Sequence, residues 1–154
     1  MEIKDKVIVI TGSARGLGKN FALDLACRKA RLALADINME QLQMVREACE
    51  ETGIEARSYD LNVSDEPAVE KFFEKVVEDF GTVDVLINNA GITRDSLIAR
   101  SKDGEIKKMS LANWQAVIDV NLTGSFLCGR EFFVKLLDQK KPGVCINISS
   151  LSRS

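Results

Sequence analysis

Histidine is absent from the 154 residues, and tyrosine and tryptophan each occur once. Without an imidazole the chain lacks the commonest general base, so any acid–base chemistry must use another kind of group. A zinc site would need thiolates or carboxylates alone, and the cysteines form no Cys-x-x-Cys pair that would favour one. We therefore expect no metal site, and we expect buried, reduced thiols in a cytoplasmic protein. The thiols in question are Cys27, Cys49, Cys128 and Cys145.

Long hydrophobic runs and blocks of one charge are also missing. The apolar runs are all short, as at Val7–Ile10, so none could span a membrane. The first residues do not suit a signal peptide. Basic residues number 21 and acidic residues 23, and they are spread along the chain with a net charge of -2. With no basic block to neutralise phosphates, nucleic acid is not an expected partner.

Short apolar runs alternate with helical patterns along a chain of one-domain length, residues 1–154. The continuous run Val7–Ile10 is expected of a strand buried on both faces. The predicted strands are Val7–Ile10, Leu32–Ala35, Ala56–Tyr59, Val83–Ile87 and Val144–Ile148. Strands that alternate with helices predict the α/β class, here a doubly wound parallel sheet with helices on both faces.

The second half of the chain carries two further expectations. The charged stretch Thr93–Lys108 is expected to be a surface segment with a turn at its Lys-Asp-Gly, and one long helix is predicted from about Ser110 to Asp138. The sequence stops just past the fifth strand without a closing helix, so we expect a sheet that is incomplete at its C-terminus.

A glycine-rich loop, Thr11–Gly18, follows the first predicted strand and leads into a helix. Gly12 permits a tight turn, Gly16 lets the backbone approach a pyrophosphate, and Gly18 lets helix and strand pack closely. The phosphates would bind at the helix N-terminus, where free N–H groups and the helix dipole favour anions. The loop therefore predicts a dinucleotide site.

Asp36 stands at the end of the second predicted strand. A carboxylate there can accept hydrogen bonds from both ribose hydroxyls and would repel a 2′-phosphate, which favours NAD(H) over NADP(H). The alternative is a strand-end or capping residue ahead of the helix that begins near Asn38.

These residues resemble the short-chain dehydrogenase/reductase family. The glycine spacing from Gly12 to Gly18 is similar to that family's loop, and Asn88-Asn89-Ala90-Gly91 after the fourth strand resembles a more specific family motif. The resemblance implies a Rossmann-like fold and a nicotinamide cofactor. The residues that it implies for cofactor binding are Gly12, Ser13, Arg15, Gly16, Leu17, Gly18, Asp36, Asn62, Val63, Asn89, Ala90 and Gly91.

The resemblance also implies catalytic roles for two residues. Asn121, inside the long helix, matches the asparagine that anchors a water in the proton path, and Ser150 matches the serine that orients the substrate oxygen. Judged without the family, Ser150 is a strand-end hydroxyl and Asn121 a polar residue that interrupts a helix. The family's proton-donating tyrosine is followed four residues later by a lysine, whereas Tyr59 is followed by Val63. We interpret Tyr59 as a core residue or as lining of the adenine pocket.

We therefore expect an NAD(H)-dependent oxidoreductase that interconverts a carbonyl and an alcohol. Ile92–Asp95 is similar to the β-ketoacyl-acyl carrier protein reductase branch, which suggests 3-oxoacyl substrates. The 154-residue chain itself should be inactive, and the full-length form a homo-oligomer. The alternative is a non-catalytic, short protein that binds a nucleotide or a partner. Two departures from the family stand out: Ala30 replaces a glycine, so that turn should lack a left-handed residue, and Thr93–Ser110 is longer than in many relatives.

Overall fold

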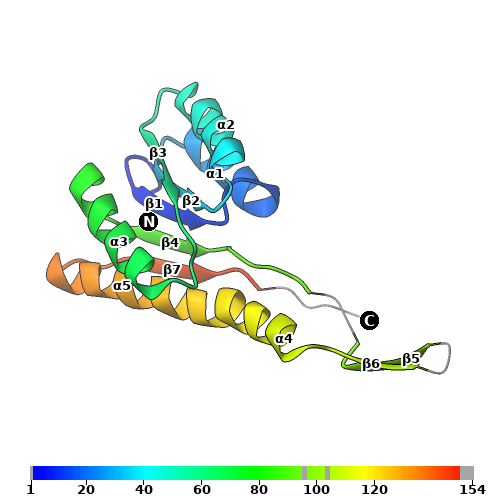
Figure 1. The fold of residues 1–154 in the computed structure, drawn as a ribbon. Helices are drawn as coiled ribbons and strands as arrows, with labels where there is room; N and C mark the ends of the chain where they lie inside the picture. Colours follow the sequence, from blue (N-terminus) through cyan, green and yellow to red (C-terminus); the bar gives the residue numbers. More distant parts are fainter. Residues whose placement is uncertain (1, 95–96, 103–104, 150–154) are drawn as a thin grey trace.

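The computed structural model describes residues 2–94, 97–102 and 105–149 (Figure 1). A sheet of five parallel strands has the order β3-β2-β1-β4-β7, and a separate two-stranded sheet joins β5 to β6. The elements are β1 (Val7–Thr11), α1 (Gly16–Cys27), β2 (Arg31–Asp36), α2 (Met39–Glu50), β3 (Ala56–Asp60), α3 (Glu66–Phe80), β4 (Val85–Asn88), β5 (Ala99–Lys102), β6 (Glu105–Lys108), α4 (Leu111–Ile118), η1 (Asp119–Thr123), α5 (Gly124–Asp138) and β7 (Val144–Asn147). The predicted doubly wound parallel sheet is confirmed.

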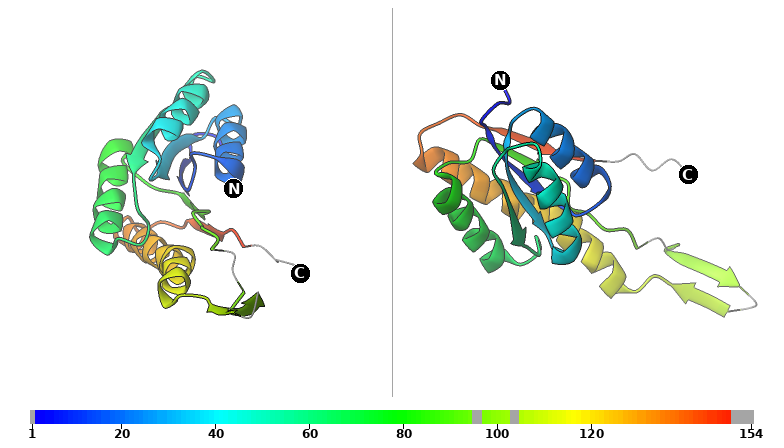
Figure 2. Two further views of the ribbon diagram at one scale, coloured as in Figure 1. Left: turned by 45° about the vertical axis from the view of Figure 1, so that its right-hand side comes forward. Right: turned by 90° about the horizontal axis from the view of Figure 1, so that it is seen from above.

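Helices cover both faces of the sheet, α1 and α2 on one and α3 and α5 on the other (Figure 2). The strand β1 contributes side chains to the hydrophobic core on both faces of the sheet, because successive side chains of a strand point to opposite faces. Ile8 and Ile10 pack with α1 and α2, whereas Val7 and Val9 pack with α3 and α5. The continuous apolar run in the sequence is thus explained by burial on both sides. No helix in the described parts of the chain is both long and apolar enough to cross a membrane.

The strand order reverses between β1 and β4, since β2 and β3 extend the sheet on one side and β4 and β7 on the other. At such a point the connections after neighbouring strands leave toward opposite faces, which opens a crevice at the carboxyl ends of the strands. The loop after β1 and the loop after β4 both reach this crevice.

The predicted helix over residues 110–138 is a continuous helical run, but its middle turn is a π-helix. Ser110 caps the first turn by accepting a hydrogen bond from the Asn113 N–H, and α4 then passes into η1 and α5. The Gly124 N–H donates to the Asp119 carbonyl, five residues earlier. The turn that contains Asn121 is therefore wider than the α-helix expected from the sequence.

The charged stretch after β4 contains a β-hairpin that the sequence did not predict. β5 and β6 pair in antiparallel fashion, and the Met109 N–H donates to the Ile98 carbonyl at the base of the hairpin. The described side chains of both strands are exposed, so there is no alternation of apolar and polar residues to reveal them. The turn expected at Lys-Asp-Gly includes residues 103–104, which lie outside the described residues.

Two smaller expectations at the end of α1 are wrong. The turn before β2 does contain a left-handed residue, because Lys29 has a φ of 64° and Ala30 is simply buried beside it. Cys27 is exposed, since Ala26 faces the sheet and the next helical residue is rotated away from it. Of the other thiols, Cys145 is half-buried, whereas Cys49 and Cys128 are buried, and burial raises the pKa values of Cys49 and Cys128 to about 11 and about 12.

Asp84 links the amino-terminal ends of the strands. Its carboxylate accepts hydrogen bonds from the Val7 N–H at 2.9 Å and from the Lys141 ammonium at 2.7 Å. Burial alone would raise the pKa of this carboxyl, but the hydrogen bonds from Lys141 and Val7 outweigh it and hold the pKa below its ordinary value of 3.8. The interaction ties β1 to the segment between α5 and β7.

We expect Asp84→Asn to lower the free energy of unfolding at pH 7 by about 2 kcal/mol, because the variant leaves Lys141 without its charged partner. The native pKa is depressed, so the carboxylate's contribution is full above the unfolded pKa of about 3.9 and disappears as pH falls through the lower native pKa. Urea unfolding at several pH values measures this. Asp24→Asn, which removes an exposed i,i+4 pair with Arg28, should cost less than about 0.5 kcal/mol. An Asp84→Asn effect as small as that of the control would contradict the assignment.

Candidate functional site

A cavity of about 490 Å³ lies at the carboxyl ends of β1, β2 and β4, where the strand order reverses. Ten of the twelve residues predicted to bind a cofactor line it: Gly12, Arg15, Gly16, Leu17, Asp36, Asn62, Val63, Asn89, Ala90 and Gly91. The other two, Ser13 and Gly18, lie behind this lining. Residues far apart in the sequence therefore meet at one place in the fold.

Reciprocal hydrogen bonds between Thr11 and Asn89 hold the glycine loop against the end of β4. The Thr11 hydroxyl oxygen accepts from the N–H groups of Asn89 and Ala90, both at 3.1 Å. In return the Asn89 amide donates to the carbonyls of Thr11 at 3.0 Å and Gly12 at 2.9 Å. Because both residues use side chain and backbone, the two loops are fixed relative to each other.

The three glycines of the loop serve different purposes. A Cβ on Gly18 would lie 2.2 Å from the Gly12 carbonyl oxygen, and one on Gly12 would lie 2.7 Å from the Ala90 Cα. Gly18 is closed by the backbone of its own loop, and Gly12 by the backbone of the loop after β4. Gly16 has a φ of +57° and nothing within 4 Å of an added Cβ. The space beside Gly16 is therefore open, and its glycine is required by the left-handed backbone.

The N-terminus of α1 opens toward this space without a cap. The helices α2, α3 and α4 begin with side-chain caps from Asn38, Asp65 and Ser110. At α1 the N-cap residue Arg15 makes no side-chain capping bond, and the first turn has no acidic residue. The positive end of its helix dipole is thus left for another partner.

Asp36 contacts the backbone of the glycine loop and that of the residue two positions after it. Its carboxylate accepts from the Ala14 N–H and from the Asn38 N–H, each at 3.0 Å. Asn38 is the N-cap of α2, so Asp36 ends β2 without capping that helix, and it also lines the cavity. Ser13 is buried, and its hydroxyl donates to the Ala35 carbonyl, so its side chain anchors the loop to β2.

Asn62 and Val63 approach the cavity from the segment after β3. The Asn62 side-chain oxygen accepts hydrogen bonds from the Ser64 N–H and hydroxyl, which shapes a tight turn. Val63 is buried against α5, where a Cβ on Gly124 would lie 2.6 Å from its methyl carbon. The glycine at the start of α5 therefore allows this segment to pack against the helix.

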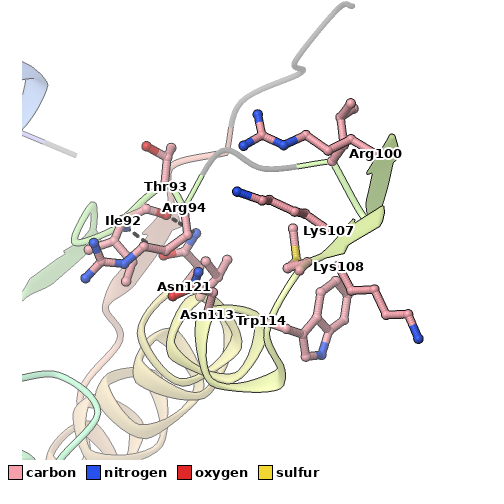
Figure 3. Close-up of a pocket in the computed structure, with 12 residues that line it drawn as sticks. Ile92, Thr93, Arg94, Arg100, Lys107, Lys108, Asn113, Trp114 and Asn121 are labelled. Atoms are coloured by element: carbon pink, nitrogen blue, oxygen red, sulfur yellow. Dashed lines mark hydrogen bonds between the residues drawn. The ribbon is translucent and has the colours of Figure 1, made fainter. Parts of the chain in front are cut away.

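A second cavity of about 920 Å³ adjoins the first, and Ile92 lines both (Figure 3). Asn121 lines this second cavity and does not line the first. Its amide is paired with the Ile92 backbone: the Ile92 N–H donates to Oδ1 at 2.9 Å and Nδ2 donates to the Ile92 carbonyl at 3.0 Å. Asn121 thus fixes the segment that separates the two cavities. Ser150 lies outside the described residues.

Tyr59 lines neither cavity. Its ring packs against Phe72, and its hydroxyl donates to the Asp79 carboxylate at 2.9 Å. Burial and this hydrogen bond raise the pKa of Tyr59, whereas a phenol that donates a proton near neutrality needs a lowered one. Tyr59 is therefore a core residue, as one of the two interpretations expected. Across the described ranges no three His, Cys, Asp or Glu residues cluster as metal ligands would.

Several lining residues were not predicted from the sequence, among them Ala14, Ile37, Gln41, Leu61 and Val120. Ala14 belongs to the glycine loop and Ile37 follows Asp36, so proximity in sequence could have indicated them. Val120 comes from η1, and no local pattern places it beside β1. Thr11 was assigned to the glycine loop, but the role of its hydroxyl could not be predicted. That hydroxyl accepts hydrogen bonds from residues that follow β4, and only the fold brings them near.

Known proteins resemble this chain in sequence and in fold. Residues 6–153 match the sequence profile described as short chain dehydrogenase. The 3-oxoacyl-acyl-carrier-protein reductase FabG of Thermotoga maritima is 37% identical over 151 residues, which are 98% of this chain and 58% of that protein. A xylitol dehydrogenase solved with NAD+ is 30% identical with a TM-score of 0.83, covering 97% of this chain and 55% of that one. A metagenomic short-chain oxidoreductase solved with NADP is 33% identical with a TM-score of 0.85, and the match covers 99% of this chain and 65% of that one. The chain thus spans little more than half of the curated relative.

Proposed function

The chain belongs to the short-chain dehydrogenase family, and on that premise we propose that its cavity at the ends of β1, β2 and β4 binds NAD(H). The protein would act as an oxidoreductase on a carbonyl and alcohol pair. The observation that carries the proposal is the uncapped N-terminus of α1 beside the open space at Gly16. A pyrophosphate fits there because the free N–H groups supply hydrogen bonds and the helix dipole favours its charge.

The adenosine half of the cofactor would lie toward β2 and β3. Asp36 accepts one backbone hydrogen bond at each carboxylate oxygen, and each oxygen keeps a lone pair for a ribose hydroxyl. The segment of Asn62 and Val63 would contact the adenine, since it lines the same end of the cavity. A 2′-phosphate would meet the Asp36 carboxylate, and Arg15, which lines the same cavity, is a cation that could offset it.

The nicotinamide half would extend along Asn89–Gly91 toward Ile92. When bound, NAD(H) supplies or accepts the hydride. Residues of this chain would position it: Asn121 fixes Ile92 through two hydrogen bonds, and Thr11 fixes Asn89. Asn121 is therefore a positioning residue, in addition to the water-anchoring role that the resemblance implies. Ser150 would orient the substrate oxygen.

The substrate proposal is a 3-oxoacyl compound. It is supported by the motif Ile92–Asp95 and by the name of the Thermotoga maritima relative. A homo-oligomer is supported by exposed apolar side chains on α5, namely Phe126, Phe133 and Leu137.

A non-catalytic nucleotide-binding protein is the second candidate function. It is favoured by the chain's single tyrosine, which is half-buried and lines neither cavity. The retained residues Asn121 and Ser150 favour the oxidoreductase, because a pure nucleotide binder does not need a substrate-orienting hydroxyl.

Gly16→Val should weaken NADH binding at least tenfold, or about 1.4 kcal/mol, because the branched side chain would occupy the space left for the pyrophosphate. Isothermal titration measures the dissociation constant. Gly81→Val is the matched control: Gly81 also has a positive φ, 78°, and no atom near an added Cβ, but it ends α3. Both variants carry the same kind of backbone strain, so only the first should lose affinity. Equal NADH binding by both would place the phosphates elsewhere.

NADH should bind at least tenfold more tightly than NADPH, because the Asp36 carboxylate would face the added phosphate. Asp36→Asn should narrow the ratio of the NADPH and NADH dissociation constants. The remaining side-chain oxygen of the variant would still accept a backbone hydrogen bond. Asp60→Asn removes the same charge from the register neighbour of Asp36 at the end of β3, and the ratio should stay unchanged. The assignment is wrong if wild-type protein binds NADPH as tightly as NADH.

The 154-residue chain should show no turnover of a 3-oxoacyl thioester at saturating NADH. Hydride transfer to a carbonyl forms an alkoxide, and a positioned acid that protonates it contributes about a hundredfold to ten-thousandfold to the rate. Tyr59 lines neither cavity, so it is not placed to supply that proton. Absorbance at 340 nm follows the reaction, and NADH binding to the same sample shows that the protein is folded. Robust turnover by a sample with a confirmed mass of 17.0 kDa would contradict this account.

A further inference from the structure

The second cavity is strongly basic although the whole chain has a net charge of -2. Its lining includes Arg94, Arg100, Lys107 and Lys108, and no acidic residue occurs among the described residues that line it (Figure 3). A cleft with charges of one sign concentrates ligands of the opposite sign. The cavity is therefore suited to an anion.

Arg100 and Lys107 stand directly opposite each other in the β5–β6 register. Like charges in that position destabilise a strand pair. Figure 3 shows both side chains extending side by side from the hairpin toward Thr93, whereas Lys108 points away. Neither Arg100 nor Lys107 forms an ion pair within residues 2–94, 97–102 and 105–149. A bound anion between the two would relieve a repulsion that the fold itself leaves in place.

The rest of the cavity is mostly apolar and leads to the cofactor cavity. Trp114 and Val117 of α4 and Met109 before it supply apolar lining, and Ile92 and Asn121 form the border. The basic hairpin and the border thus belong to one continuous space. An elongated molecule could place an uncharged end near Ile92 and a charged end at the hairpin.

We propose that this cavity binds the phosphate-bearing end of the substrate, with Arg100 and Lys107 as its principal ligands. Phosphate fits this lining better than a carboxylate does, because it carries up to two negative charges and three strong acceptor oxygens. The assignment of the reacting end of the substrate depends on the proposed function. Anion binding at the hairpin does not depend on it. The substrate is then a phosphorylated carbonyl compound or a thioester of a phosphorylated carrier.

The only tryptophan of the chain, Trp114, lines this cavity, so its fluorescence reports on the occupant. The test titrates the full 154-residue chain, without nucleotide, with two probes that share a 3-oxobutanoyl thioester. One is the coenzyme A thioester, which carries phosphates, and the other is the N-acetylcysteamine thioester, which is uncharged. We expect the coenzyme A thioester to bind at least tenfold more tightly, with an affinity that falls as salt is raised.

The double variant Arg100→Gln/Lys107→Gln should bring the two affinities to within about twofold, because both charge-assisted contacts are lost. Its fold should not suffer, since the change removes a like-charge pair from the hairpin; circular dichroism and thermal unfolding check this. Lys71→Gln is the control, because Lys71 is exposed on α3, which lies far from the hairpin in Figure 1. Equal wild-type affinities for the two thioesters would overturn the proposal, and so would a preference that survives in the double variant.

NADH binding, measured on the same proteins, separates this proposal from the proposed function. Normal NADH affinity with no preference for the phosphorylated thioester would refute the anion site and leave the cofactor assignment standing. A clear preference that the double variant abolishes, with no NADH binding, would refute the cofactor assignment and support the anion site.

Discussion

The reciprocal hydrogen bonds between Thr11 and Asn89 are the constraint on which the candidate site depends. They join the carboxyl ends of β1 and β4, the two strands between which the order of the sheet reverses. They also bring the Ala90 backbone close to Gly12 and the Asn89 amide close to Gly18. With the loop fixed, the first turn of α1 points its free N–H groups into the cavity, where an anion can be bound without further rearrangement.

The charges of the molecule divide along the sheet in a way that suits this role. At the amino-terminal ends of the strands, Asp84 is paired with Lys141, so these two charges neutralise each other. At the carboxyl ends, α1 is uncapped and the hairpin residues Arg100 and Lys107 lack acidic partners in the described chain. Ile92, held by Asn121, separates these two positive regions. A cofactor in one cavity and a charged substrate in the other would meet at this residue.

Much of the fold could be predicted from the sequence because its signals are local. The apolar run of β1 indicated burial on both faces, and the structure buries it there. The hairpin β5–β6 could not be predicted in this way, since its exposed strands bury no apolar face and leave no alternation. The π-helix at Asn121 was also hidden, because a helical pattern does not distinguish a turn that is widened by one residue.

The sequence by itself determined the parallel α/β sheet, the glycine loop and most of the residues around the first cavity. The sheet and the loop follow from spacing and from the backbone freedom of glycine, which act over a few residues, whereas Asn62, Val63 and Asn89–Gly91 were implied by the family resemblance. Only the tertiary structure decided that Ser13 anchors the loop instead of facing the cavity, that Asn121 pairs with Ile92, and that two cations share one side of a hairpin. Each of these depends on which segments, distant in the chain, are brought within hydrogen-bonding or Coulombic range, and packing of the whole sheet sets those distances.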